Sequence, residues 1–117
     1  MIRTRLLAAL AALPMSLLAV SPDLVISHVY GAGGNTGATW RNDFVVVFNR
    51  ASSPVTLTGK SIQYSSATGT GLFSQQPVVA LTGTLAPGQY HLVQMAGGAN
   101  GTLLPTADTT GTTSMAA

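Results

Sequence analysis

The stretch that decides the fold runs from Ser27 to Arg50 and reads SHVYGAGGNTGATWRNDFVVVFNR. A short β-prone segment leads into a glycine-rich loop, and the stretch closes with the apolar run Phe44–Phe48. Valine and aromatic residues favour extended backbone, and glycine clusters mark connections. The stretch therefore predicts two strands joined by a loop. Because Phe44–Phe48 is apolar on both alternations, we expect that strand to be covered on both faces at the centre of the domain.

The rest of the chain continues the pattern of short apolar runs between turn residues. All 13 glycines lie at or after Gly31, and no segment after Ser21 has the spacing of an amphipathic helix. Several short strands in a small chain predict an all-β antiparallel sandwich or barrel. Pro87-Gly88 predicts a tight turn. The expected strands are Leu24–Tyr30, Asp43–Asn49, Val55–Leu57, Ser61–Ser65, Val78–Leu81 and Tyr90–Met95, with a frayed or incomplete last strand at Thr112–Ala116.

The N-terminal segment has the composition of an export signal. Arg3 and Arg5 precede the unbroken apolar run Leu6–Leu13, which Pro14 ends. A transmembrane helix needs about 20 apolar residues, so this shorter run favours a Sec-type secretory signal peptide over a retained anchor. We therefore expect the protein to be secreted or held in the cell envelope.

Cleavage after a small residue sets the expected domain boundaries. Ala19 is the expected last residue removed, and Ala12 is the alternative. Residues 1–19 would then be the signal peptide, and residues 20–117 the mature β-sandwich domain, with a loop-rich and incomplete tail over residues 97–117.

The formal charge of +2 belongs to the signal, because it includes Arg3 and Arg5. The mature chain keeps three scattered cations and three aspartates, which balance. Binding to nucleic acid through phosphates needs a cluster of lysine and arginine, so the mature chain carries no strong nucleic-acid signal. Membrane contact is expected only through the signal peptide. The absence of cysteine excludes disulfides, thiolate metal sites and a cysteine nucleophile.

The glycine loop Gly31–Gly37 invites comparison with a phosphate-binding loop. A dinucleotide fingerprint would need glycine at Thr36 and a helix after the loop. A strand is expected there instead, so the loop is interpreted as a flexible connection between two strands. Trp40 follows this loop, and we expect it to anchor the edge of the core rather than form an exposed platform for a sugar or base.

The residues that could carry catalysis are few. His28 and His91 lie in separate expected strands without a neighbouring ligand pattern, so we expect packed or surface histidines. A hydrolytic triad built on either histidine stays a minor alternative, because no serine lies in a G-x-S-x-G elbow. We therefore assign no catalytic, cofactor-binding or metal-binding residue and no cofactor. The oxygen donors that could contribute to a calcium site, a question that stays open, are Asn35, Asn42, Asp43 and Asp108.

Several short motifs follow one another in a fixed order. They are Val25–Tyr30, the glycine loop with Asn35 and Gly37, Asn42-Asp43-Phe44, Phe48-Asn49-Arg50, Val55–Gly59, Ile62–Ser65, Leu85–Val93 and Leu104-Pro105. In this order and spacing the chain resembles a bacterial lamin tail domain from about Leu24 to Met115, which is nearly all of the mature chain.

The resemblance implies an immunoglobulin-like β-sandwich with a non-catalytic role. Such domains occur on secreted or surface proteins, often beside nucleases or phosphatases of the endonuclease/exonuclease/phosphatase type, where they act as binding or tethering modules. Two positions depart from the family pattern: Val46 stands where a glutamate is usual, and Gly59-Lys60 replaces a Gly-Trp pair. Similar members also continue past the Thr112–Met115 strand, so the resemblance implies that the last strand is missing.

A missing strand would leave an unpaired edge beside an apolar sheet. Three outcomes stay open: a marginally stable domain, self-association through an edge strand, or a gene fragment. The expected function is an exported, non-catalytic module that binds an unidentified ligand at the envelope or outside the cell. The alternative is the N-terminal fragment of a secreted endonuclease/exonuclease/phosphatase-type enzyme whose catalytic domain is missing.

Overall fold

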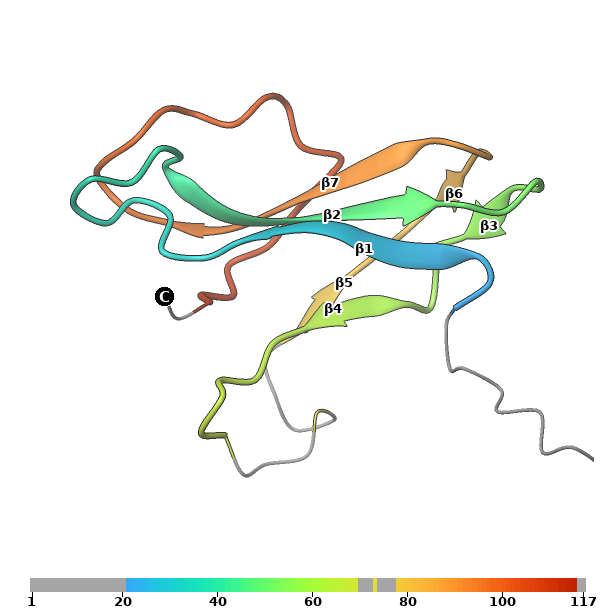
Figure 1. Cartoon of the computed structure of the whole chain (residues 1–117), viewed down its shortest axis with the longest axis horizontal. Helices are drawn as coiled ribbons and strands as arrows, with labels where there is room; N and C mark the ends of the chain where they lie inside the picture. The colour runs from blue at the N-terminus through green and yellow to red at the C-terminus, as the bar shows by residue number, and fades with distance from the viewer. Residues whose placement is uncertain (1–20, 70–72, 74–77, 116–117) are drawn as a thin grey trace, which may run out of the picture.

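The computed structural model describes residues 21–69, 73 and 78–115, which form an all-β structure (Figure 1). This confirms the expected fold class. The expected signal peptide, residues 1–19, lies outside the described residues. Within the described part of the chain, no helix is long and apolar enough to cross a membrane. The strands are β1 Leu24–Tyr30, β2 Asn42–Asn49, β3 Val55–Thr56, β4 Ser61–Gln63, β5 Val78–Ala80, β6 Thr84–Leu85, β7 Tyr90–Gly97 and β8 Thr109–Thr110.

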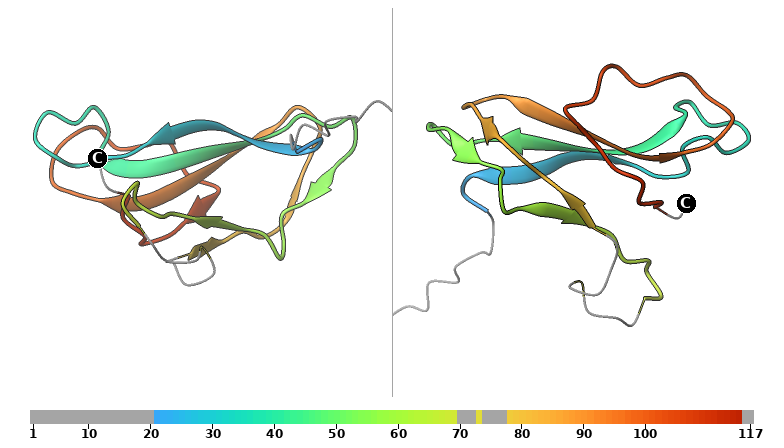
Figure 2. Two further views of the ribbon diagram at one scale, coloured as in Figure 1. Left: turned by 60° about the horizontal axis from the view of Figure 1, so that its bottom comes forward. Right: turned by 180° about the vertical axis from the view of Figure 1, so that it is seen from behind.

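The strands form two layers. The larger layer is a four-stranded sheet in the order β1-β2-β7-β8, in which β2 is antiparallel to both β1 and β7, and β8 is parallel to β7. The pairs β3-β6 and β4-β5 are both antiparallel. Figures 1 and 2 show β4-β5 on one side of the larger sheet, so the arrangement is a sandwich.

The central strand β2 alternates between a buried face and a half-buried face. Val45 and Val47 point into the sandwich and are only 2% and 4% exposed. Phe44, Val46 and Phe48 point to the other side of the sheet, which we call the outer face, and they are half-buried. The prediction that both faces of this strand are covered by the fold is therefore wrong.

Neighbouring strands supply the partial cover on the outer face. The ring of Phe44 stacks on Tyr30 of β1 at 5.3 Å between centroids, and Phe48 lies against Tyr90 of β7 at 4.6 Å. Aromatic pairs on adjacent strands contribute to sheet stability without a covering layer. These pairs explain why a run that is apolar on both alternations occurs on a face that no described strand packs over.

The hydrophobic core lies between the two layers. The larger sheet contributes valine and methionine side chains, the smaller pairs contribute leucine, isoleucine and valine, and the C-terminal segment adds a methionine. The buried residues are Val45, Val47, Leu57, Ile62, Val79, Leu81, Leu85, Val93, Met95 and Met115, with Leu24 and Tyr64 partly buried against them.

The C-terminal part of the sheet differs from the expected one. A frayed or incomplete last strand was expected at Thr112–Ala116, but no strand forms at residues 112–115, and Ala116 lies outside the described residues. The last described strand is β8, Thr109–Thr110, and it runs parallel to β7. The reason is that the chain joins β7 earlier, where the Asp108 backbone N–H donates to the carbonyl of Leu92 at 2.9 Å. The Ala96 N–H then donates to the Thr113 carbonyl, also at 2.9 Å, so this segment follows β7 for several residues.

Two smaller expectations also change. Trp40, which was expected at the edge of the core, is half-buried and forms a parallel bridge with Thr102, and the partly buried residues packed against the core cluster are Leu24 and Tyr64 instead. The two-residue strand β6 was not expected, since it lies between Gly83 and the turn at Pro87-Gly88. That turn is confirmed by a Gly88 φ of 72° and by an N–H···O bond from Gln89 to Ala86.

Candidate functional site

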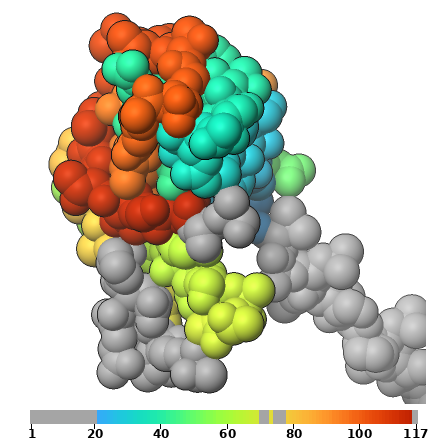
Figure 3. Space-filling view, turned by 90° about the vertical axis from the view of Figure 1, so that its left-hand side faces the viewer, coloured from blue at the N-terminus to red at the C-terminus, as the bar shows by residue number. Residues whose placement is uncertain are grey.

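A pocket of about 260 Å³ lies at the end of the larger sheet where β1 joins β2. Three segments that are distant in sequence form it: the loop before β2, the end of β7 and the C-terminal segment. Figure 3 shows these teal, orange and red segments side by side at one end of the molecule. Its lining includes Gly33, Asn35, Asp43, Gly97, Ser114 and Met115.

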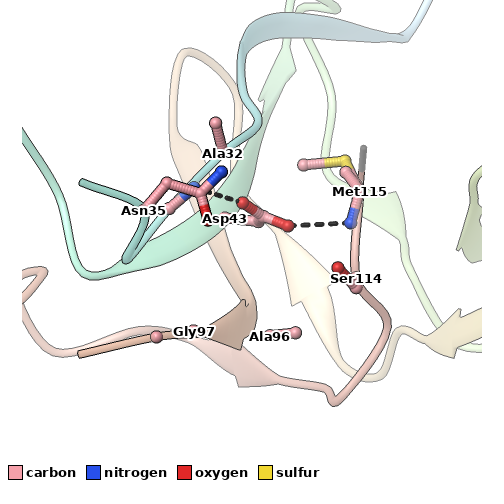
Figure 4. Close-up of a pocket in the computed structure, with 9 residues that line it drawn as sticks. Ala32, Asn35, Asp43, Ala96, Gly97, Ser114 and Met115 are labelled. Carbon is pink, nitrogen blue, oxygen red and sulfur yellow. Dashed lines mark hydrogen bonds between the residues drawn. The ribbon is translucent and has the colours of Figure 1, made fainter. Parts of the chain in front are cut away.

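Asp43 is the central side chain of this pocket (Figure 4). It lies on the core-facing side of β2 and is only 3% exposed. Its Oδ1 accepts a hydrogen bond from the backbone N–H of Gly33 at 2.6 Å, and its Oδ2 accepts one from Met115 at 2.7 Å. A carboxylate that accepts backbone N–H groups on both oxygens holds two segments of chain, and here they are the loop and the tail.

Asn42 and Asn100 complete the connections between these segments. The Asn42 side chain donates to the carbonyl of Met95 at 3.0 Å, and the side chain and backbone N–H of Asn100 both donate to Gly34 at 3.1 Å. The backbone N–H of Gly98 donates to the carbonyl of Arg41 at 3.0 Å. The loop is therefore held at Gly34 and Arg41 by hydrogen bonds from the segment that follows β7.

The glycine loop connects two strands, as predicted, but it is packed closely rather than free. Gly34 has a φ of 77°, and a Cβ at this position would overlap the backbone of Gly98. A Cβ at Gly33 would overlap the backbone of Asn42. Glycine is required here for close backbone approach, with no phosphate-binding helix after it.

Asn49 plays a comparable structural role at the opposite end of β2. Its side chain is fully buried, with 0% exposure. Its amide donates to the carbonyls of Ser53 and Leu85 at 3.0 and 2.9 Å, and its Oδ1 accepts from the Ala51 N–H at 2.9 Å. The two polar residues of the family motifs that are buried in β2, Asp43 and Asn49, thus both bind backbone.

The structure places the two histidines on opposite faces of the sheet. His28 is exposed and pairs with Val46, whereas His91 is buried and pairs with Val47. The Nε2 of His91 lies 2.7 Å from the Thr109 hydroxyl, and the Nδ1 of His28 lies 2.8 Å from the hydroxyl of Ser27, its neighbour in sequence. One histidine is therefore exposed and the other packed, and their positions on opposite faces keep them from forming a common site.

The four oxygen donors considered for calcium are only partly brought together. Asn35 and Asp43 both line the pocket, and the Asn42 side chain is bound to the end of β7. Asp108 lies apart from them, where its Oδ2 accepts the Leu92 N–H at 2.8 Å. Among the described residues, no group of three or more histidine, cysteine or acidic side chains could hold a metal ion.

The contribution of the C-terminal segment to this site was not expected from the sequence. Thr113 and Met115 are buried, and Ser114 lies at the pocket between them. The alternation of Thr113, Ser114 and Met115 is too short and too polar to distinguish a docked segment from a frayed end. The sequence signal that could have indicated this contact is Asp43, because an aspartate buried next to an apolar run needs hydrogen-bond partners from elsewhere in the chain.

A family model described as Lamin Tail Domain matches residues 19–117. Comparisons with curated proteins and with solved structures give no significant match.

Proposed function

Because the chain belongs to the lamin tail domain family of immunoglobulin-like β-sandwiches, often non-catalytic modules, we propose that it is an exported, non-catalytic module that binds or tethers at the cell envelope or outside the cell. Its ligand would be an extracellular or envelope component. Contact with the membrane would be limited to the signal peptide.

The proposal that the module is non-catalytic is supported by the hydrogen bonds of the buried polar side chains, which go to groups of the fold itself. Asp43 and Asn49 bind backbone groups, and His91 binds the hydroxyl of Thr109. Within the described residues, no buried side-chain nitrogen or oxygen lacks a hydrogen-bond partner. Catalysis by general acids and bases needs a polar group that reaches a reacting atom, and these groups are already engaged in holding the fold.

The outer face supports a role in binding. It carries Phe44, Val46 and Phe48 of β2, all half-buried, and Tyr90 of β7, whose side chain is 60% exposed. Uncovered apolar surface with exposed aromatic rings is typical of interaction sites. The proposal therefore assigns binding to this face rather than to the polar pocket around Asp43.

Export is tested by expressing the full chain in a bacterium and sequencing the N-terminus of the product recovered outside the cytoplasm. We expect the product to begin at Val20, after removal of the signal peptide, residues 1–19. A full-length chain retained in the cytoplasm would contradict export.

Tethering is tested by co-sedimentation of the exported product with purified envelope fractions. We expect Tyr90→Ala to reduce the bound fraction. Leu103→Ala is the matched control, since Leu103 is 64% exposed but lies in the loop between β7 and β8. Equal losses in both variants, or no retention of the unaltered product, would contradict binding through the outer face.

The alternative function is a fragment of a secreted endonuclease/exonuclease/phosphatase-type enzyme. It rests on the enzyme domains that often occur in the same proteins as similar domains. The DNA downstream of the coding sequence tests it. A nuclease-like domain in another reading frame would favour this alternative, and unrelated sequence would favour the separate module.

A further inference from the structure

The edge strand β1 carries apolar side chains that face the core but stay exposed. In the order β1-β2-β7-β8, β1 forms one edge of the larger sheet. Ile26 pairs with Val47 and Val29 pairs with Val45, so both lie on the core-facing side. Yet Ile26 and Val29 are 60% and 62% exposed, whereas their partners are 4% and 2% exposed. The apolar inner surface of the sheet therefore extends beyond its present cover.

A β-bulge produces this arrangement. Ile26 and Val29 are three residues apart, so in a regular strand they would point to opposite faces. The β1–β2 register shifts between Ile26 and His28, which leaves Ser27 as the extra residue. The bulge turns both side chains to the core side and leaves His28 on the outer face.

The chemistry of the edge identifies what could cover it. β1 has seven residues, none of them charged, and one side of its backbone is unpaired among the described residues. Natural edges are usually blunted by lysine, by proline or by short length. The pairs β3-β6 and β4-β5 have strands of only two or three residues, so β1 is the longest described strand with an open edge. An uncharged, extended strand with aliphatic side chains on one face would satisfy it.

β1 itself has these properties, and every copy of the chain carries one. We propose that two copies pair through their β1 strands, antiparallel about a two-fold axis perpendicular to the sheet. Such an axis keeps the core-facing sides of both sheets on the same side, so Ile26 and Val29 of one copy meet those of the other. An isologous contact of this kind uses each edge once and closes as a dimer.

Charge does not oppose this pairing. The nearest charged residue of the described chain is Asp23, which precedes β1. In an antiparallel pair, Asp23 lies beyond the partner's Tyr30, beside the uncharged segment of Gly31 and Ala32. Two like charges are therefore not placed opposite each other, which would destabilise a pair of strands.

The test is the molar mass of the purified, exported product, measured by light scattering over a range of concentrations. We expect a monomer–dimer equilibrium that Val29→Lys and Ile26→Lys each weaken at least about tenfold, equivalent to 1.4 kcal/mol. Leu103→Lys, at an exposed leucine outside the sheet, should leave the equilibrium unchanged. Circular dichroism of each variant verifies folding.

Cysteine cross-linking gives a second readout that does not depend on lysine being tolerated. The chain has no cysteine, so single variants at Ile26, Ser27 and His28 scan the register of the pair. At least one of them should form a disulfide-linked dimer under mild oxidation, because paired Cα atoms lie within disulfide range. Leu103→Cys should not.

A product that stays monomeric at all concentrations would overturn the proposal. So would a dimer that persists in both lysine variants, or one that is lost in Tyr90→Ala, which would place the interface on the outer face. The measurement uses purified protein without envelope material. A monomeric result would therefore not contradict the proposed tethering function, and a failure to bind envelope fractions would not contradict the dimer.

Discussion

The carboxylate of Asp43 accepts a hydrogen bond from the backbone N–H of Met115, 2.7 Å away and 72 residues later in the chain. The other oxygen of the same carboxylate accepts the N–H of Gly33 in the glycine loop. One buried side chain therefore joins the loop, the central strand and the C-terminal segment. The Asn42-Asp43 pair at the start of β2 is therefore a structural element of this fold, and the stability of the fold should depend on Asp43.

Asp43→Asn should destabilise the protein by about 2–3 kcal/mol, the range for hydrogen bonds to a charged group. An amide keeps one acceptor but presents an N–H₂ group to a backbone donor. Urea unfolding followed by circular dichroism measures the change. The control is Asp108→Asn, because Asp108 is exposed and accepts one backbone N–H. A loss at Asp108 equal to that at Asp43 would contradict the central role of Asp43.

Asn49→Ala should destabilise the protein by about 3 kcal/mol, because it leaves one buried and two part-buried backbone groups without their side-chain partner. The carbonyls of Ser53 and Leu85 and the N–H of Ala51 would all lose their side-chain bonds. Asn35→Ala, at an exposed position, should change the free energy of unfolding by less than about 0.5 kcal/mol. Similar values for the two variants would show that burial of Asn49 does not matter.

Gly34→Ala and Gly37→Ala form a matched pair. Both glycines have positive φ, 77° and 81°, so each alanine carries a backbone penalty of about 1–2 kcal/mol. A Cβ at Gly37 meets nothing within 4 Å, whereas one at Gly34 overlaps the backbone of Gly98. Thermal unfolding should therefore show a clearly larger loss for Gly34→Ala. Equal losses would mean that the loop is not packed against the end of β7.

Val46→Glu tests the position where this chain departs from the family pattern. Val46 lies on the half-buried outer face between His28 and Leu92, so a glutamate there should cost only about 1 kcal/mol. Val45→Glu places the same side chain in the core, where Val45 is 2% exposed, and should prevent folding at room temperature. Soluble yield and circular dichroism measure both. A severe defect in Val46→Glu would indicate that the outer face is covered.

Much of the fold could be predicted because the apolar runs and their turns are local signals. The predicted bounds of β1 match the observed ones, and those of β2 differ by one residue. The apolar run Phe44–Phe48 favours extended backbone, and the turn residues around both strands mark their ends. The parallel pairing of β8 could not be predicted. Thr109-Thr110 has no hydrophobic pattern, and its place is set by His91 and by the backbone of β7.

The site was harder to predict, since it depends on contacts between distant segments. Asp43 could be identified as unusual before an apolar strand, but its partners in the loop and the tail follow only from the fold. The exposure of Ile26 and Val29 also depends on a bulge at Ser27, for which the sequence LVISHVY has no local signal such as glycine.

The most direct test of the central claim, that the chain is a non-catalytic module, is a hydrolysis assay of the exported product on nucleic acid and on phosphoesters. The account predicts no activity above that of a mock purification, with His28→Ala and His91→Ala indistinguishable from the unaltered chain. Hydrolysis that co-purifies with the folded product and is abolished by either histidine substitution would contradict it.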